Sequence, residues 1–137
     1  MKAARIFETC LYADDLPAAE RFYSEVLHLE VVSRHEGRLV AFRCGPGVLL
    51  VFDPQRTRIA DSDLPAHGAD GPGHVAFLAS ESELDGWRRQ LQSFGVAIDR
   101  EINWPEGGCS LYFRDPAGNV LEFAPPALWG FGGAVLR

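Results

Sequence analysis

The sequence "FRDPAGNVLEFAP" at residues 113–125 repeats an earlier stretch, "FRCGPGVLLVFDP" at residues 42–54. Written one over the other without gaps, the two stretches agree at six of thirteen positions. A repeat of this kind indicates that one supersecondary unit occurs twice in the chain, and overlooking it would misassign the whole fold. We therefore interpret the rest of the sequence as two copies of one module.

The segments that precede each repeated stretch follow the same order. Alternating apolar residues at 5–13 predict a strand, Asp15 is a suitable N-cap for a helix, and three short strands are expected within 29–54. The order then restarts with a strand at 74–79 and a helix over 81–94. Three further strands are expected at 96–102, 109–115 and 119–125.

The predicted fold class is therefore α+β, with two tandem βαβββ modules in a single domain over residues 1–137. The polar stretch between the modules is rich in Asp, Gly and Pro, which is typical of a linker. The expected boundaries are about 5–54 for module 1, 55–72 for the linker, about 73–126 for module 2 and 127–137 for an apolar C-terminal tail.

Composition limits the partners that this chain can have. Its net charge is −6 and its arginines form no dense basic block, which argues against a nucleic-acid partner. No stretch reaches the roughly 20 apolar residues of a membrane span, and the first residues lack a signal-peptide pattern. Three cysteines without C-x-x-C spacing suit reduced thiols. We expect a cytoplasmic protein with no nucleic-acid or membrane partner.

Strand alternation assigns faces to the repeated residues. Residues two apart on a strand share a face, so Leu121 with Phe123, and Leu50 with Phe52, are expected to pack beneath the helix of their module. The opposite face would then carry the residues between them, Val51 in module 1 and Glu122 in module 2. The starts of the modules also align, "ETCLYA" (8–13) over "HVAFLA" (74–79), which makes Glu8 and His74 equivalent positions.

Three segments resemble a known superfamily: "YADDLPAAERFYSEVL" (12–27), "GPGHVAFLA" (71–79) and "YFRDPAGNVLEFAPP" (112–126). They are similar to the vicinal oxygen chelate superfamily, which includes glyoxalase I, extradiol dioxygenases, fosfomycin-resistance transferases and bleomycin-resistance proteins. The resemblance implies a cupped, partly open mixed β-sheet with helices on the outside, built around a divalent metal. Members are commonly dimers, so it also implies a homodimer.

The resemblance implies four ligand positions, which fall on Glu8, Val51, His74 and Glu122. His74 and Glu122 match the superfamily's histidine and glutamate. Glu8 stands where histidine or glutamine is more common, and Val51 cannot bind a metal. The expected metal ligands are therefore Glu8, His74 and Glu122, and the two carboxylates are also the candidate catalytic residues.

This ligand set indicates the chemistry. Carboxylates suit Mn and Mg, and imidazole also suits Fe, Ni and Zn, so Mn, Ni or Fe is favoured, with Zn or Mg possible. The predicted function is a metal-dependent glyoxalase- or dioxygenase-like enzyme that binds a small substrate through vicinal oxygens and uses the metal as a Lewis acid. The alternative is a non-catalytic protein that sequesters a small molecule, as bleomycin-resistance proteins do, with the three residues lining a metal-free cup.

Two other residues stay open on sequence grounds. His67 lies in the linker, where it could be a solvated loop residue or an additional ligand or acid. Trp104 lies in a loop between strands, where it could form the rim of a pocket or tuck against its own sheet.

Overall fold

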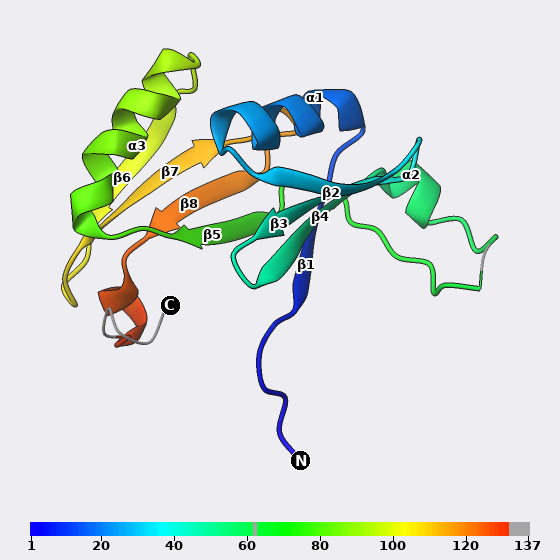
Figure 1. Ribbon diagram of the computed structural model, residues 1–137, viewed down its shortest axis with the longest axis horizontal. Helices are drawn as coiled ribbons and strands as arrows, with labels where there is room; N and C mark the ends of the chain where they lie inside the picture. Colours follow the sequence, from blue (N-terminus) through cyan, green and yellow to red (C-terminus); the bar gives the residue numbers. More distant parts are fainter. Residues whose placement is uncertain (62, 132–137) are drawn as a thin grey trace. The chain divides into compact units, whose positions relative to one another are not determined.

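The structure is a computed structural model that describes residues 1–61 and 63–131 (Figure 1). The chain is divided into two compact units, each with its own four-stranded sheet. The first unit contains residues 1–73 and 116–119, and the second contains residues 74–115 and those from 120 onward. The short segment 116–119 therefore packs with the first unit although the strands on either side of it belong to the second.

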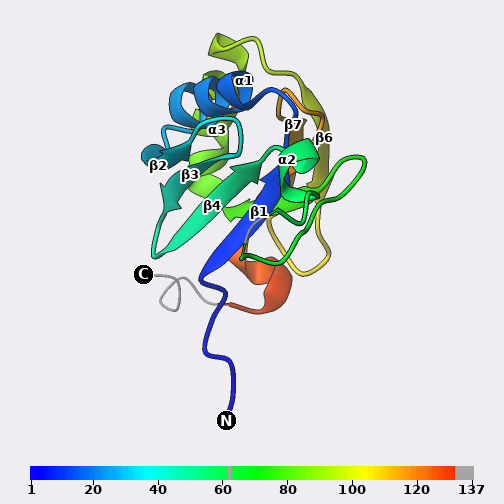
Figure 2. The same ribbon diagram turned by 90° about the vertical axis from the view of Figure 1, so that its right-hand side faces the viewer.

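The first unit has the order βαβββ. Its sheet has the strand order β1-β4-β3-β2, in which β1 and β4 are parallel and the other pairs are antiparallel. Figure 2 shows β1 and β4 side by side. The elements are β1 (Glu8–Tyr12), α1 (Leu16–Arg21), η1 (Phe22–Val26), β2 (Glu30–His35), β3 (Leu39–Cys44), β4 (Gly47–Phe52) and α2 (Pro54–Thr57).

The first helix begins where the sequence predicts. The Asp15 carboxylate accepts a hydrogen bond from the Ala18 amide at 2.9 Å and caps the helix. From Phe22 the helix continues as the π-helical turn η1, a widening that the apolar spacing does not reveal. The helical segment is followed by His28, whose φ of 55° lies in the left-handed region that usually favours glycine.

The helix covers one face of its sheet. Tyr23 is fully buried, and its ring centroid lies 5.4 Å from that of Phe42. In the strand register Phe42 lies opposite Leu49, and Val51 shares that buried face with Leu11. The prediction that Leu50 and Phe52 lie beneath this helix is therefore wrong, because both belong to the opposite face.

The second unit repeats the order βαβββ, so the tandem βαβββ prediction is confirmed. Its sheet has the order β5-β8-β7-β6, again with one parallel pair, β5 and β8. Figure 1 shows α3 lying along one face of this sheet. The elements are β5 (His74–Leu78), α3 (Glu81–Ser93), β6 (Ile98–Asn103), β7 (Cys109–Arg114), β8 (Val120–Ala124) and η2 (Pro126–Trp129).

Helix α3 is fixed at its start and along its apolar face. A capping box joins Ser80 and Glu83, whose carboxylate accepts from the Ser80 amide at 2.7 Å. Trp87 stacks on Phe123 with ring centroids 4.1 Å apart, and Leu121 is fully buried. The prediction that Leu121 and Phe123 face the helix is correct, and it leaves Glu122 on the other face.

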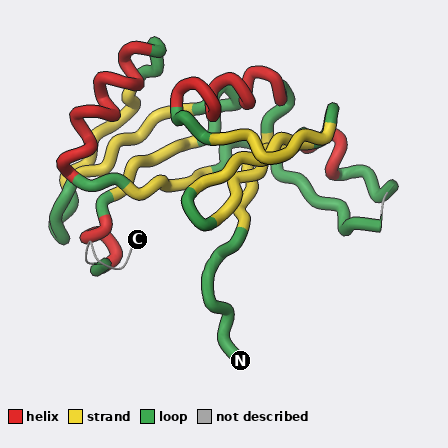
Figure 3. The backbone as a smooth tube through the Cα atoms, in the orientation of Figure 1, coloured by secondary structure: helices red, strands yellow, loops and turns green. Residues whose placement is uncertain are grey.

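The predicted linker 55–72 belongs to the first unit; it contains α2 after Pro54, and its other described residues form turns and loops (Figure 3). Of the predicted C-terminal tail, residues 132–137 lie outside the described part of the chain. No helix among the described residues is long and apolar enough to cross a membrane.

Candidate metal centre

The second unit brings His74 and Glu122 together. His74 begins β5 and Glu122 lies in the middle of β8, and the register places His74 opposite Val120 and Ala76 opposite Glu122. Both side chains therefore leave the sheet on the face away from α3. His74 Nε2 lies 3.3 Å from Glu122 Oε2, so the structure brings these two predicted residues together, and their role as metal ligands stays a prediction.

The hydrogen bond on the other side of the imidazole defines its tautomer. His74 Nδ1 lies 2.9 Å from the carbonyl oxygen of Val120, which can only accept, so Nδ1 carries a proton. In the neutral form of this tautomer, Nε2 carries a lone pair and faces a carboxylate oxygen. The Nε2 lone pair and the carboxylate oxygen repel each other unless a proton or a metal cation lies between them. A histidine that binds a metal through one ring nitrogen usually donates the N–H of the other to a backbone carbonyl or a carboxylate.

Glu122 gives a second reason to expect that this site binds a cation. Its side chain is only 6% exposed, and its Oε1 is buried without a hydrogen-bond partner. A buried carboxylate oxygen without a partner carries a large desolvation cost, which a metal ion would offset. An imidazole Nε2 next to a carboxylate, one of whose oxygens has no hydrogen-bond partner, therefore fits a divalent cation.

Tyr112 lies next to this pair. It faces Glu122 directly across the β7–β8 ladder, and its ring is nearly parallel to that of His74, with the centroids 6.3 Å apart. Burial and the nearby Glu122 carboxylate together raise the pKa of Tyr112 to about 12. The sequence analysis missed this residue. Alternation in "CSLYFRD" gives the face of Tyr112, but placing Tyr112 beside Glu122 also requires the pairing of β7 with β8, which the sequence alone does not give.

Glu8 belongs to the first unit. It begins β1, is exposed, and shares its face with Cys10 and Tyr12. Within the described residues of either unit, no three His, Cys, Asp or Glu side chains form a group that could hold a metal ion. His74 and Glu122 thus form a pair within their unit, and the role of Glu8 as third ligand stays a prediction.

The fourth ligand position does not fall on Val51. Glu122 lies opposite Ala76, two residues after His74, whereas the residue opposite Cys10, two residues after Glu8, is Leu50. Leu50 is therefore the counterpart of Glu122, and Val51 points into the core beneath the first helix. The number of expected metal ligands stays at three, because leucine, like valine, cannot bind a metal.

A one-residue difference between two turns explains the error. The pair Arg43 and Val48 in the first unit encloses four residues, 44–47, whereas the equivalent pair Arg114 and Val120 encloses five, 115–119. An alignment without gaps is correct for β3 and β7 but shifts β4 by one residue relative to β8. In a strand, a shift of one residue exchanges the two faces.

His67 is a second residue whose surroundings the sequence could not define. It is exposed, but the Tyr12 hydroxyl lies 2.7 Å from its Nδ1, and its ring packs edge-on against Phe52 at 4.7 Å. The loop therefore returns to the face of the first sheet that carries Glu8. The structure shows His67 as a hydrogen-bonded loop residue.

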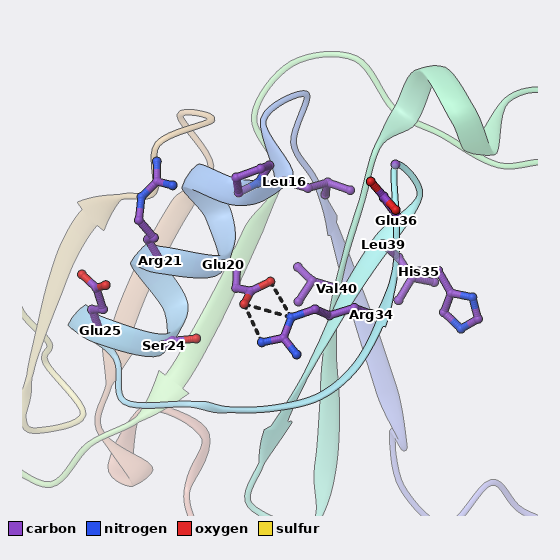
Figure 4. Close-up of a pocket in the computed structure, with 12 residues that line it drawn as sticks. Leu16, Glu20, Arg21, Ser24, Glu25, Arg34, His35, Glu36, Leu39 and Val40 are labelled. Carbon is purple, nitrogen blue, oxygen red and sulfur yellow. Dashed lines mark hydrogen bonds and ion pairs between the residues drawn. The ribbon is translucent and has the colours of Figure 1, made fainter.

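The first unit also contains a groove of about 620 Å³ between the helical segment α1–η1 and the β2–β3 hairpin (Figure 4). Arg34 reaches across it to Glu20 through bonds of 2.7 to 3.0 Å to both carboxylate oxygens. This hydrogen bonding lowers the pKa of Glu20. None of the predicted site residues lines the groove, and its central charges neutralise one another.

Comparisons with known proteins agree with this fold. Residues 5–123 match the Glyoxalase/Bleomycin resistance protein/Dioxygenase superfamily. A crystal structure described as lactoylglutathione lyase from Agrobacterium tumefaciens is 45% identical, with a TM-score of 0.92, and the match covers 96% of this chain and all of that one. A glyoxalase/bleomycin resistance protein/dioxygenase from Nocardioides is 25% identical with a TM-score of 0.73, over 91% and 85% of the two chains.

A curated relative, metallothiol transferase FosB from Shouchella clausii (strain KSM-K16), is 41% identical over 51 residues. That match spans 36% of this chain and about a third (35%) of the relative's length. The matched family covers most of the chain, and its fold is the one described above. The protein therefore belongs to the Glyoxalase/Bleomycin resistance protein/Dioxygenase superfamily.

Proposed function

We propose that the protein is a divalent-metal-dependent enzyme that acts on a small substrate with vicinal oxygens. The observation that carries the proposal is the buried Oε1 of Glu122, which has no hydrogen-bond partner, in a carboxylate whose Oε2 lies 3.3 Å from His74 Nε2. These two residues would hold the metal, and Glu8 would supply a further ligand or act as a base. Mn, Ni or Fe remains the favoured metal, because the donors are nitrogen and oxygen without sulfur.

Each residue has a distinct task in this proposal. His74 binds through Nε2 while the Val120 carbonyl fixes its ring, and Glu122 supplies negative charge from a buried position. When bound, the metal supplies Lewis-acid stabilisation of the negative charge that develops on a substrate oxygen. Positions that the protein leaves open are available to water or to two neighbouring oxygens of the substrate.

The similarity to a lactoylglutathione lyase supports lactoylglutathione as the first substrate to test. This compound is an α-hydroxy thioester, so its hydroxyl and carbonyl oxygens are adjacent and suit chelation. A second assay would measure thiol transfer to fosfomycin, because the partial match to FosB points to that chemistry. The homodimer and the cytoplasmic location stay predictions.

Metal content is the test that separates this enzyme from a metal-free binding protein. The untagged protein should contain a divalent metal after purification, or bind Mn²⁺ or Ni²⁺ after treatment with a chelator. Metal binding should raise the melting temperature, since a ligand that binds only the folded state stabilises it. A protein that contains no metal, and whose melting temperature none of Mn²⁺, Ni²⁺, Fe²⁺ or Zn²⁺ changes, would refute the proposal.

A further inference from the structure

Within the second unit, a row of polar side chains leads toward His74 and Glu122. The Trp104 indole Nε1 donates to the Ser110 hydroxyl at 2.7 Å, although Ser110 is fully buried. Ser110 and Tyr112 are two residues apart on β7 and share one face, and Tyr112 lies opposite Glu122. We call Trp104, Ser110 and Tyr112 the polar row.

The polar row runs along one face of the second sheet to Glu122. Trp104 donates to Ser110, and Ser110 precedes Tyr112 by two residues on β7. Tyr112 lies directly opposite Glu122 on β8, and its ring is nearly parallel to that of His74.

The start of the polar row is held by its own turn. The Trp104 amide donates to the Gly108 carbonyl and the Gly107 amide donates back to the Trp104 carbonyl, both at 3.0 Å. Gly108 adopts a φ of +83°, and a Cβ there would lie 2.6 Å from Pro125 Cβ. Only glycine fits this position, so the turn holds the indole against β7.

We propose that Tyr112 is a positioning residue for the metal site, with its hydroxyl directing the Glu122 carboxylate and its ring supporting the His74 imidazole. Ser110 and Trp104 in turn orient the Tyr112 hydroxyl. In this arrangement the polar row positions Glu122 so that its Oε1, which has no hydrogen-bond partner, can bind the metal. The inference rests on the proposed function, because it assumes that His74 and Glu122 bind a metal.

Groups that orient metal ligands from behind typically change metal affinity by about 10- to 100-fold when they are removed. Tyr112→Phe deletes the hydroxyl and keeps the ring beside His74. It should weaken Mn²⁺ binding by at least about tenfold in calorimetric titration. Trp104→Phe acts through two intervening groups and should weaken it less. Trp129→Phe changes a tryptophan that is 76% exposed and serves as the control.

A spectroscopic measurement distinguishes positioning from general stabilisation. The chain has three tryptophans, whose indole N–H groups give separate signals in a ¹H–¹⁵N NMR spectrum. Titration with Zn²⁺, which is diamagnetic, should change the chemical shift of the Trp104 indole N–H, because the polar row connects Trp104 to the metal site. The chemical shift of the Trp129 indole N–H should stay unchanged. In Tyr112→Phe the movement of the Trp104 signal should be lost while the protein stays folded by circular dichroism.

The outcomes separate the two proposals. If wild type binds Mn²⁺ and Tyr112→Phe binds it equally well, the positioning role is wrong and the proposed function stands. A Trp104 signal that moves equally in both proteins would also overturn the polar row. If wild type binds no divalent metal, the proposed function fails first, and the inference about Tyr112 fails with it.

Discussion

Val51 and Leu50 allow a direct test of which face of β4 lies beneath the helix. Val51 is fully buried among core side chains, whereas Leu50 is partly exposed on the opposite face. Full burial can raise the pKa of a glutamate to about 8 or 9, so the carboxyl would stay protonated at pH 7 in the folded protein. Val51→Glu should therefore lower the free energy of unfolding at pH 7 by about 4 kcal/mol, because the unfolded chain ionises at about 2.7 pH units below this pH.

Leu50→Glu should cost about 1 kcal/mol, because only part of the leucine surface leaves a partly buried position. Urea unfolding followed by circular dichroism measures both variants, with Val51→Ala as a control for lost volume alone. The difference between the two glutamates should exceed about 1 M in the urea midpoint. The cost of Val51→Glu should also shrink as the pH falls toward 4, because a protonated carboxyl is easier to bury.

Equal costs for the two glutamates, or a larger cost for Leu50→Glu, would refute the assigned faces. Such a result would restore the alignment without gaps and return Val51 to the face of Glu8. The shift of one residue between β4 and β8 would then have to be abandoned.

Further predictions concern the turns and the surface. Asn119 is buried and bonds two backbone groups, so Asn119→Ala should lower stability by about 2 to 3 kcal/mol in chemical denaturation. Gly108→Ala combines a positive φ with a clash at Pro125 and should cost at least about 2 kcal/mol, seen as a lower melting temperature. Arg34 lowers the pKa of Glu20, so this pair stabilises the fold above the normal carboxyl pKa and less as acid protonates Glu20. Glu20→Gln should therefore lose less stability than wild type between pH 6 and about pH 3 in melting curves, and an identical loss would exclude this contribution.

The sequence predicts the βαβββ repeat and the shared face of His74 and Glu122 because both depend on the local alternation of apolar and polar residues. Alternation along "NVLEFAP" places Leu121 and Phe123 on one face and Glu122 on the other, and the structure confirms this. The same argument fails on β4, because strand faces depend on register. The register depends on a turn that is one residue shorter in the first unit.

Other features depend on contacts between distant parts of the sequence. The pairing of β7 with β8 places Tyr112 opposite Glu122, and no periodicity within one strand contains that information. His67 lies in the loop that follows α2 and meets Tyr12 across 55 positions of the sequence. The π-helical turn after α1 has apolar spacing that resembles an ordinary helix, so its sequence does not distinguish the two.

Calorimetric titration of Mn²⁺ into wild type and Glu122→Gln tests the central claim most directly. Glu122→Gln keeps the shape of the side chain and removes its charge, and Glu36→Gln in an exposed turn is the matched control. We expect wild type and Glu36→Gln to bind one metal ion per chain and Glu122→Gln to bind at least about tenfold more weakly with an unchanged fold. Equal affinity in Glu122→Gln, or no binding in wild type, would contradict a metal centre at His74 and Glu122.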